Sequence, residues 1–340
     1  MPTDTAAVAA LRRIAFLLEL AREPTYRVRA FRRAADIVSA LPLGELERRI
    51  ADGSLQQLPG IGGVTAMAIT QAQQGETPVY LRRLESTEGR VVADDAAALC
   101  AALRGDCHVH SDWSDGGSSI LEMAETARSL GHEYVVLTDH SPRLTVAKGL
   151  SAERLRRQLD EVQRLNIELA PFRILTGIEI DINEDGSLDQ EDDLLDRLDI
   201  VVASVHSVLR MPAAQMTQRM TTAIANPRMD ILGHCTGRII VGRGRPESQF
   251  DAYAIFDACR RFDVAVEINS RPERLDPPKR LLRLAMELGC RFAIDTDAHA
   301  PGQLGWQMNG CERGAACGLP ADRVVNTMAA ADLLAWASRR

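Results

Sequence analysis

The hydrophobic pattern changes character at about residue 105. Residues 6–20 and 27–40 carry apolar side chains at helical spacing, and short helices are expected to continue to about residue 85 with almost no strand signal. After residue 105, short β-branched runs alternate with amphipathic helical stretches, which is typical of βα units around a parallel sheet. The pattern predicts an α/β domain preceded by a small all-helical domain.

Seven apolar runs are the candidate strands of the second domain. Because the C-terminal helix at about 320–338 supplies no further strand, the expected fold is a distorted seven-stranded (β/α)7 barrel instead of a closed eight-stranded one. The expected domains are 1–90 and 105–340, joined by a linker at 91–104 that contains one short helix. The runs are residues 107–110, 134–140, 173–182, 199–206, 229–235, 264–270 and 291–299, and helices are expected at 118–131, 151–169, 211–226, 249–262 and 278–289.

Composition supports an ordinary globular protein. The 340 residues are 46% hydrophobic and 26% charged, which suffices for two buried cores. The N-terminus has no secretory pattern and no run of about 18 apolar residues occurs, so a cytoplasmic protein without a membrane segment is expected. The seven cysteines include no CxxC pair and are expected to be reduced.

Charge is divided unevenly along the chain. The net charge of −7 argues against binding nucleic acid by bulk attraction, although a local basic patch remains compatible with it. Residues 1–100 sum to zero, so the rest of the chain carries the whole acidic excess. A cluster of metal-binding carboxylates is one explanation, and an ordinary acidic surface is the other.

Histidine placement is the strongest chemical signal. Parallel strands of a β/α barrel end at one face, so side chains at their C-terminal ends meet even when they are far apart in sequence. His132 precedes a strand and is interpreted as structural. The other six histidines fall at or just after predicted strand ends, and they are His108, His110, His140, His206, His234 and His299.

Carboxylates occur at the same strand ends, and two local spacings suit metal binding. Asp115, Asp139, Glu179 and Asp297 accompany the histidines, and imidazole together with carboxylate binds zinc, manganese or iron. His108-x-His110 and Asp297-x-His299 place two side chains on one face of a strand, because residues i and i+2 point the same way. The sequence therefore predicts a metal site built from several strands.

These residues also resemble a known family. CHVHSDWSDG, LTDHS, GIEIDI, SVHS, GHCTGR and DTDAH resemble, in order, the motifs of the PHP (polymerase and histidinol phosphatase) domain family over residues 105–327. The segments TGRIIVGRGRP, EINSRPERLDPP and VVNT resemble the PHP domain of bacterial family X DNA polymerases. The resemblance implies three divalent ions, Mn²⁺, Zn²⁺ or Fe²⁺, with Glu179 bridging two of them. The implied ligands are His108, His110, Asp115, His140, Glu179, His206, His234, Asp297 and His299.

The implied chemistry is hydrolysis of a phosphate ester by a metal-activated water, which needs no side-chain nucleophile. Arginine or lysine side chains would bind the phosphate oxygens. Arg238 is the preferred candidate because its loop follows a metal-bearing strand. Arg143, Lys148, Arg271 and Arg274 are further candidates, and Cys235 stands where related proteins usually have proline.

The N-terminal region carries a second motif. LPGIGGVTAMAI, residues 58–69, has the glycine turn of a helix-hairpin-helix, whose Gly60, Ile61, Gly62 and Gly63 are expected to meet a DNA phosphate through backbone N–H groups. A glycine-rich connector is the alternative from these residues alone. Together with LLELAREPTYRVRAFRRAADIV, the motif resembles the small N-terminal domain of family X polymerases.

Only some 15 residues separate the two recognised parts, so the palm and fingers of a polymerase are missing between them and no polymerase activity is expected. Residues 1–100 also lack lysine, which excludes a Schiff-base lyase there. The leading hypothesis is a 3′-5′ exonuclease or 3′-phosphatase acting on 3′ ends or gapped DNA. A small-molecule phosphomonoesterase of the histidinol-phosphatase type and a non-catalytic DNA-binding module are the alternatives, and the sequence leaves the oligomeric state open.

Overall fold

The structure is a computed structural model that describes residues 5–88 and 94–338. The chain divides into two compact units, Met1–Val91 and Val92–Arg340. The domain boundary expected at residues 90–91 lies outside the described residues. Within the described ranges, every helix is too short or too polar to cross a membrane.

The first unit contains only helices, as the spacing of its apolar residues predicts. Its core is formed by side chains such as Leu11, Ile14, Phe31 and Ile69, which are almost fully buried. Thr5 caps the first helix by accepting a hydrogen bond from the N–H of Val8. The helices are α1 (Ala6–Leu20), α2 (Thr25–Ser39), α3 (Glu45–Ala51), the 3-10 turn η1 (Leu55–Gln57), α4 (Gly63–Gln73) and α5 (Val79–Glu88).

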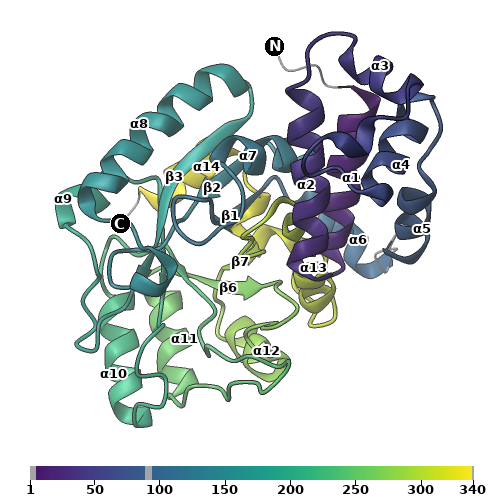
Figure 1. Ribbon diagram of the computed structural model, residues 1–340. Coiled ribbons are helices and arrows are strands. Elements are labelled where there is room, and N and C mark those ends of the chain that lie inside the picture. The colour runs from purple at the N-terminus through teal and green to yellow at the C-terminus, as the bar shows by residue number, and fades with distance from the viewer. Residues whose placement is uncertain (1–4, 89–93, 339–340) are drawn as a thin grey trace. The chain divides into compact units, whose positions relative to one another are not determined.

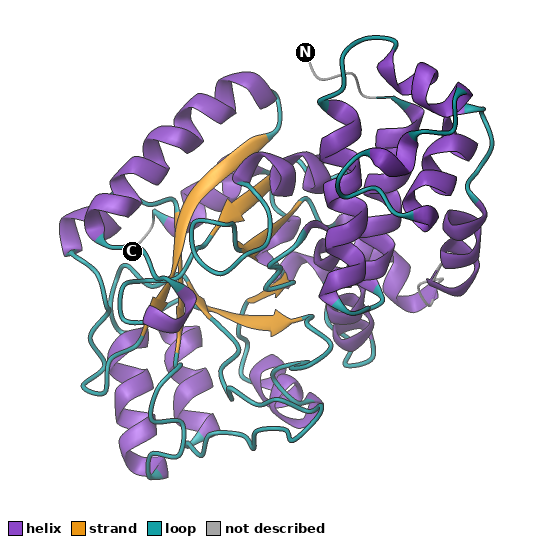
Figure 2. Cartoon of the chain, viewed as in Figure 1, coloured by secondary structure: helices purple, strands orange, loops and turns teal. Residues whose placement is uncertain are grey.

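The second unit is built on seven parallel strands whose order in the sheet follows their order in the chain (Figure 2). A parallel bridge between Val109 and Ala298 joins the ends of the first and last strands, so the sheet forms a nearly closed barrel. The predicted seven-stranded barrel is therefore confirmed. The strands are β1 (Gly105–Val109), β2 (Tyr134–Leu137), β3 (Arg173–Asp181), β4 (Ile200–Ser204), β5 (Ile231–Leu232), β6 (Ala265–Asn269) and β7 (Phe292–Asp295).

Helices lie between and outside the strands, and α7, α8 and α11 pack against β2, β3 and β6 (Figure 1). Every strand is buried along its length except β3, where Arg173 is exposed and Thr176 partly exposed, as expected for a parallel sheet whose two faces are both covered. The helices are α7 (Ile120–Ser129), α8 (Ala152–Leu169), α9 (Asp192–Leu195), α10 (Ala213–Ile224), α11 (Ala252–Arg261), α12 (Lys279–Glu287), α13 (Gln307–Ala315) and α14 (Ala330–Ala337).

One helix lies in the segment expected to be a linker. Helix α6 (Asp94–Ala102) packs against α13, and its Ala96 and Leu99 side chains belong to the core of the barrel unit. A short helix is predicted here from the sequence, but its packing partner α13 is not. The barrel unit therefore begins before β1.

Candidate metal centre

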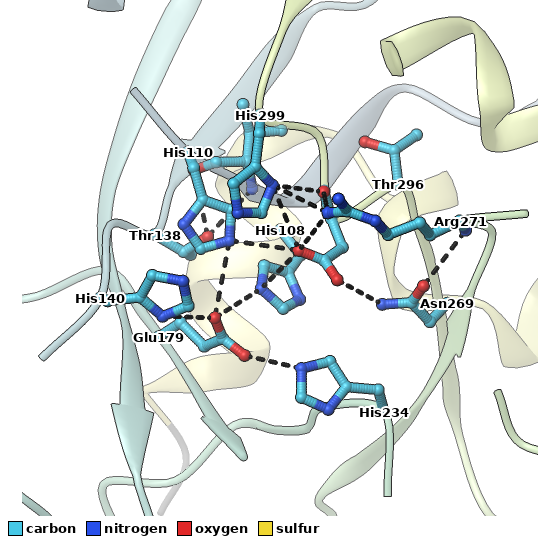
Figure 3. A network of polar contacts seen from close by, with 12 residues as sticks. His108, His110, Thr138, His140, Glu179, His234, Asn269, Arg271, Thr296 and His299 are labelled. Carbon is cyan, nitrogen blue, oxygen red and sulfur yellow. Dashed lines mark hydrogen bonds and ion pairs between the residues drawn. The ribbon is translucent and has the colours of Figure 1, made fainter. Parts of the chain in front are cut away.

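The nine predicted ligands gather at the C-terminal ends of the strands. His108 lies next to the last residue of β1, His140 follows β2, Glu179 lies in β3, and the remaining ligands follow β1, β4, β5 and β7. Figure 3 shows the imidazoles of His108, His140 and His234 around the Glu179 carboxylate. All nine are linked by side-chain distances of 2.9–3.9 Å, so the structure brings the whole predicted set together.

The ligand atoms form three overlapping groups, each compact enough for one ion. In each group the candidate atoms lie within 4.8 Å of one another. Such sets of imidazole and carboxylate suit borderline divalent cations. The groups are His110, Asp115, His140 and His299; His108, His110 and Glu179; and His140, Glu179 and His206.

Glu179 belongs to two of these groups and divides its oxygens between different histidines. Its Oε2 lies 3.3 Å from His108 Nε2 and 2.9 Å from His140 Nδ1. Its Oε1 lies 3.2 Å from His206 Nε2 and 2.9 Å from His234 Nε2. A carboxylate with one oxygen toward each of two ligand sets has the geometry to bridge two cations.

Several buried ligand atoms lack hydrogen-bond partners. Within the described residues, His108 Nε2, His110 Nε2 and Glu179 Oε2 are buried without a partner of hydrogen-bonding geometry. A buried polar atom without a partner destabilises the folded state, and an ion or a water molecule bound to it removes that penalty. The two nitrogens lie 3.3 and 3.5 Å from the Glu179 oxygen, so a cation between them would satisfy all three atoms.

Electrostatics at the centre favour the ionised carboxylates. Burial by itself opposes charge on Glu179, but the surrounding imidazoles, His108 among them, hold its pKa well below the ordinary value. Burial also lowers the pKa of His108, yet Glu179 and Glu267 raise it well above the ordinary value. Burial and the neighbouring His299 keep the pKa of His110 well below the ordinary value, which favours the neutral imidazole that binds metals.

A cavity of about 350 Å³ opens onto these ligands. Arg271 and Arg274 line it together with Asp115, His140 and Asp297. Arg274 Nε lies 3.2 Å from Asp297 Oδ2, and its Nη1 is buried without a hydrogen-bond partner in the described part of the chain. Arg271 donates from Nη1 to the carbonyl oxygen of Asp297 at 3.2 Å. These guanidinium groups can therefore meet an anion in the cavity.

Arg238, the preferred phosphate-binding candidate from the sequence, is placed differently. Its Nε donates to the carbonyl oxygen of Arg274 at 3.0 Å, and its Nη2 donates to that of Leu275. It does not line the cavity formed by the described residues. Its contacts hold the loop that carries Arg274, so the geometry gives it a supporting position. The sequence could not reveal this because the contact joins two separate loops.

The other two cationic candidates also lie apart from the lining of this cavity within the described residues. Arg143 lies 3.6 Å from Asp181 and 3.8 Å from Glu184, and it donates to Asn183. Lys148 is exposed at the surface. Neither position favours phosphate binding over an ordinary surface role.

Asp139, beside His140, fixes the loop that presents Asp115. Its buried carboxylate accepts hydrogen bonds from the N–H and hydroxyl of Ser111, the hydroxyl of Ser114 and the amide of Gln158. Burial raises the pKa of Asp139, and these donors oppose that rise. Asp139 therefore acts on the loop instead of facing a cation.

The sequence analysis missed two buried residues on β6, Glu267 and Asn269. Glu267 Oε1 lies 2.6 Å from His108 Nδ1, and Asn269 Nδ2 donates to Asp297 at 3.2 Å. The signal was present, because polar residues in the otherwise apolar run VAVEINS share one face of the strand at i and i+2.

The helical unit contains its own candidate surface around the glycine turn. A cavity there is lined by Gly60, Gly62 and Gly63 together with Arg27 and Tyr26. Gly60 has φ of +106°, so the backbone favours glycine here, and a Cβ at this position would lie 2.7 Å from Arg33 Nε and displace that side chain.

The four predicted DNA-contacting residues differ in what they can offer. The Ile61 side chain is buried in the helical core, and the Gly62 N–H already donates to Thr65 Oγ1 at 2.9 Å. Gly63 begins α4, where N–H groups of the first turn have no partner within the helix. Among the arginines of α2, Arg32 forms an ion pair with Glu19 and is structural.

Comparisons with known proteins match both units. Residues 106–271 match the family model of the PHP domain, and residues 3–77 match that of the helix-hairpin-helix domain. The DNA polymerase/3′-5′ exonuclease PolX of Bacillus subtilis is 45% identical over 197 residues, which cover 58% of this chain and 34% of that protein. This chain thus spans about a third of the length of that relative.

Smaller relatives are matched over more of their length. A probable phosphatase of Thermoanaerobacter sp. (strain X514) is 29% identical over 65% of this chain and 89% of the relative. The histidinol phosphate phosphatase of Lactococcus lactis, solved with zinc, L-histidinol and phosphate, matches with a TM-score of 0.43 and 19% identity over 58% of this chain and 87% of that one.

Proposed function

This chain carries a PHP domain behind a helix-hairpin-helix domain, and from that pairing we propose that it is a metal-dependent phosphoesterase acting on DNA ends. The observation that carries the proposal is the Glu179 carboxylate, which faces His108 and His140 with one oxygen and His206 and His234 with the other. Imidazole nitrogens buried without partners destabilise an ordinary protein core, whereas bound ions in a multi-ion centre would coordinate them.

Seven of the nine predicted ligands form the three groups described above, and His234 and Asp297 lie beside them, so the set suits three divalent ions, manganese, zinc or iron. Bound metal ions in such a centre supply a hydroxide at neutral pH and neutralise the charge of the phosphate. The chain itself orients the ester. Arg271 and Arg274 line the cavity from beside Asp297, where their guanidinium groups can bind the phosphate oxygens.

DNA is the proposed substrate because a second unit suited to phosphate backbones precedes the metal centre. Helix α4 begins at the glycine turn, and Arg27 and Arg83 line the cavity beside it. The 45% identical relative is named as a 3′-5′ exonuclease, which supports release of nucleotides or phosphate from 3′ ends. We therefore propose 3′-5′ exonuclease or 3′-phosphatase activity on free or gapped ends.

The test is a comparison of 3′-hydroxyl and 3′-phosphate DNA, each labelled at the 5′ end and incubated with purified protein. Reactions contain Mn²⁺, Zn²⁺ or a chelator, and His108→Ala serves as the inactive control. Shortened strands or released phosphate that require both metal and His108 support the proposal. Intact DNA ends under every metal condition would contradict it.

A small-molecule phosphomonoesterase is the second candidate. It is supported by the 29% identical relative named as a probable phosphatase, which the match covers almost completely. Under this alternative, truncation of the helical unit leaves turnover of a phosphomonoester unchanged. If DNA ends are the substrate, removing residues 1–91 lowers activity on DNA far more than activity on p-nitrophenyl phosphate. The ratio of the two rates separates the candidates.

A further inference from the structure

Of the seven strands that the structure describes, β6 alone neither contains one of the nine predicted ligands nor leads directly into one. It lies between β5, which leads to His234, and β7, which leads to Asp297. Its two buried polar residues, Glu267 and Asn269, share one face and contact ligands from three other strands. The strand without a ligand is thus connected to the metal centre at several points.

We propose that Glu267 and Asn269 are positioning residues that fix the orientation and tautomer of the metal ligands, an inference that rests on the proposed metal centre. Glu267 acts on His108 and His234, and Asn269 acts on Asp297. Metal-binding histidines commonly donate their second ring N–H to a carboxylate, and loss of such a partner typically weakens metal binding by about 10–100-fold.

Glu267 is fully buried and accepts from three N–H donors. His108 Nδ1 lies 2.6 Å from Oε1, the backbone N–H of His234 donates to Oε2, and the Asn269 amide donates to Oε2 at 3.2 Å. Two of these groups can only donate, so Glu267 must accept at Oε2. An ionised carboxylate also accepts at Oε1, which places the proton of His108 on Nδ1.

When a bound cation displaces the second proton of the ring, this assignment leaves His108 Nε2 as the lone-pair donor directed at the centre. The Nε2 atom is buried without a hydrogen-bond partner in the described part of the chain and lies 3.3 Å from Glu179 Oε2. If Glu267 did not hold the Nδ1 proton, the imidazole could place its proton on Nε2 and lose the capacity to bind a cation. The carboxylate therefore determines which nitrogen of His108 is the ligand.

Asn269 extends the same support to Asp297. Its Nδ2 donates to Glu267 Oε2 and to Asp297 Oδ2, both at 3.2 Å, and its Oδ1 accepts from the N–H of Arg271 at 3.1 Å. Asp297 has φ of +54°, a left-handed conformation that is uncommon outside glycine and must be held by its surroundings. The amide links two carboxylates without adding charge, which an aspartate at this position could not do.

Glu267→Gln is the most informative variant because it keeps the shape and removes one acceptor. If the new amide NH₂ faces the two N–H donors of His234 and Asn269, those donors lose their acceptor. If it faces His108 instead, Nδ1 must accept, and the ring proton moves to Nε2. Either arrangement damages a ligand, so the amide cannot replace the carboxylate.

The experiment is a competition titration of stripped, full-length protein with Zn²⁺ against a chromogenic chelator. Glu267→Gln is expected to weaken at least one site by about 10–100-fold, and Asn269→Ala by about 10-fold. In the His108→Ala background, Glu267→Gln should add little, because its main route of action has been removed. Nitrogen NMR of the zinc-loaded wild type should show the His108 proton on Nδ1.

Asp199→Asn is the matched control. Asp199 accepts hydrogen bonds from the N–H and hydroxyl of Thr176, in the N-terminal half of β3, so its amide variant loses comparable contacts but should bind zinc normally. Wild-type affinity in Glu267→Gln, additivity with His108→Ala, or a His108 proton on Nε2 would each overturn the proposal. Zinc binding by a wild type that cleaves no ester would instead count against the proposed function alone.

Discussion

The imidazoles of His110 and His299 stack with their centroids 4.1 Å apart and their planes at 28°. His110 follows the first strand of the barrel and His299 follows the last. The backbone N–H of His110 donates to the carbonyl oxygen of Ala298 at 2.8 Å, beside the bridge between Val109 and Ala298. Closure of the barrel between the first and last strands therefore places these two candidate ligands side by side.

His299→Ala is expected to remove one ion and most of the activity. His299 Nε2 lies 3.3 Å from Asp115 Oδ1, and both belong to the ligand group with His110 and His140. Loss of a direct ligand should lower kcat/KM by at least about 100-fold, since loss of a supporting contact already costs up to that amount. Elemental analysis should show fewer ions per chain, and an unchanged metal content would contradict the assignment.

Arg274→Ala should lower kcat/KM by about 100-fold, the typical effect of removing one preorganised donor to a developing charge. Arg274→Lys should restore little, because an ammonium group lacks the planar fork that can pair with Asp297 and bind a phosphate oxygen at the same time. Steady-state kinetics on one ester substrate provide the measurement. Arg164→Ala, on the exposed face of α8, is the control and should remain active.

Arg238→Ala separates a supporting position from direct phosphate contact. Arg238 donates to the backbone carbonyls of Arg274 and Leu275, so its loss should loosen this loop and reduce kcat/KM by a smaller factor, about 10-fold. The double variant with Arg274→Ala should be no worse than Arg274→Ala alone. A larger loss in Arg238→Ala than in Arg274→Ala would restore Arg238 as the residue that binds phosphate.

Metal removal should destabilise the barrel unit. The buried imidazole and carboxylate atoms of the centre have unmet polar contacts that a cation would satisfy. An ion at 100 times its Kd stabilises the folded state by about 2.7 kcal/mol per site. Thermal unfolding of stripped protein should therefore shift upward by several degrees on addition of Mn²⁺ or Zn²⁺, and Glu179→Gln should reduce that shift.

His132 should make folding sensitive to moderate acid. Burial lowers its pKa from 6.5 to about 4, so below pH 6.5 the unfolded chain takes up a proton that the folded protein does not. The free energy of unfolding should fall as the pH drops from about 6.5 to 4, by about 2 kcal/mol at pH 5. Denaturant titrations of metal-stripped wild type and His132→Gln measure this, and parallel pH profiles would exclude it.

Val64→Asp tests the helix-hairpin-helix surface. Val64 is exposed in the first turn of α4 and lines the cavity beside the glycine turn, so a carboxylate there should repel a DNA phosphate. We expect affinity for DNA ends to fall by about 10-fold, with unchanged turnover of p-nitrophenyl phosphate. Leu43→Asp adds the same charge at an exposed position outside that cavity lining and should bind DNA normally.

The sequence alone determined the architecture and predicted which side chains gather at the strand ends. Apolar runs of strand length that alternate with amphipathic helices can bury both faces of a parallel sheet in few ways, so the barrel followed from the pattern. The candidate ligands could be identified because all strand ends meet at one rim of the barrel. A residue at the end of a strand is therefore expected to lie at that rim. His108, Glu179 and His299 illustrate this rule.

Tertiary structure decided what depends on contacts between separate elements. The sequence could not rank Arg238 and Arg274, since only the packing of their two loops shows which guanidinium meets the cavity. It also could not assign Glu267 to His108, because that pairing requires the barrel to fold and bring β6 within reach of the end of β1. Periodicity reports which face a residue occupies, whereas hydrogen bonds depend on side-chain distances that only the folded chain fixes.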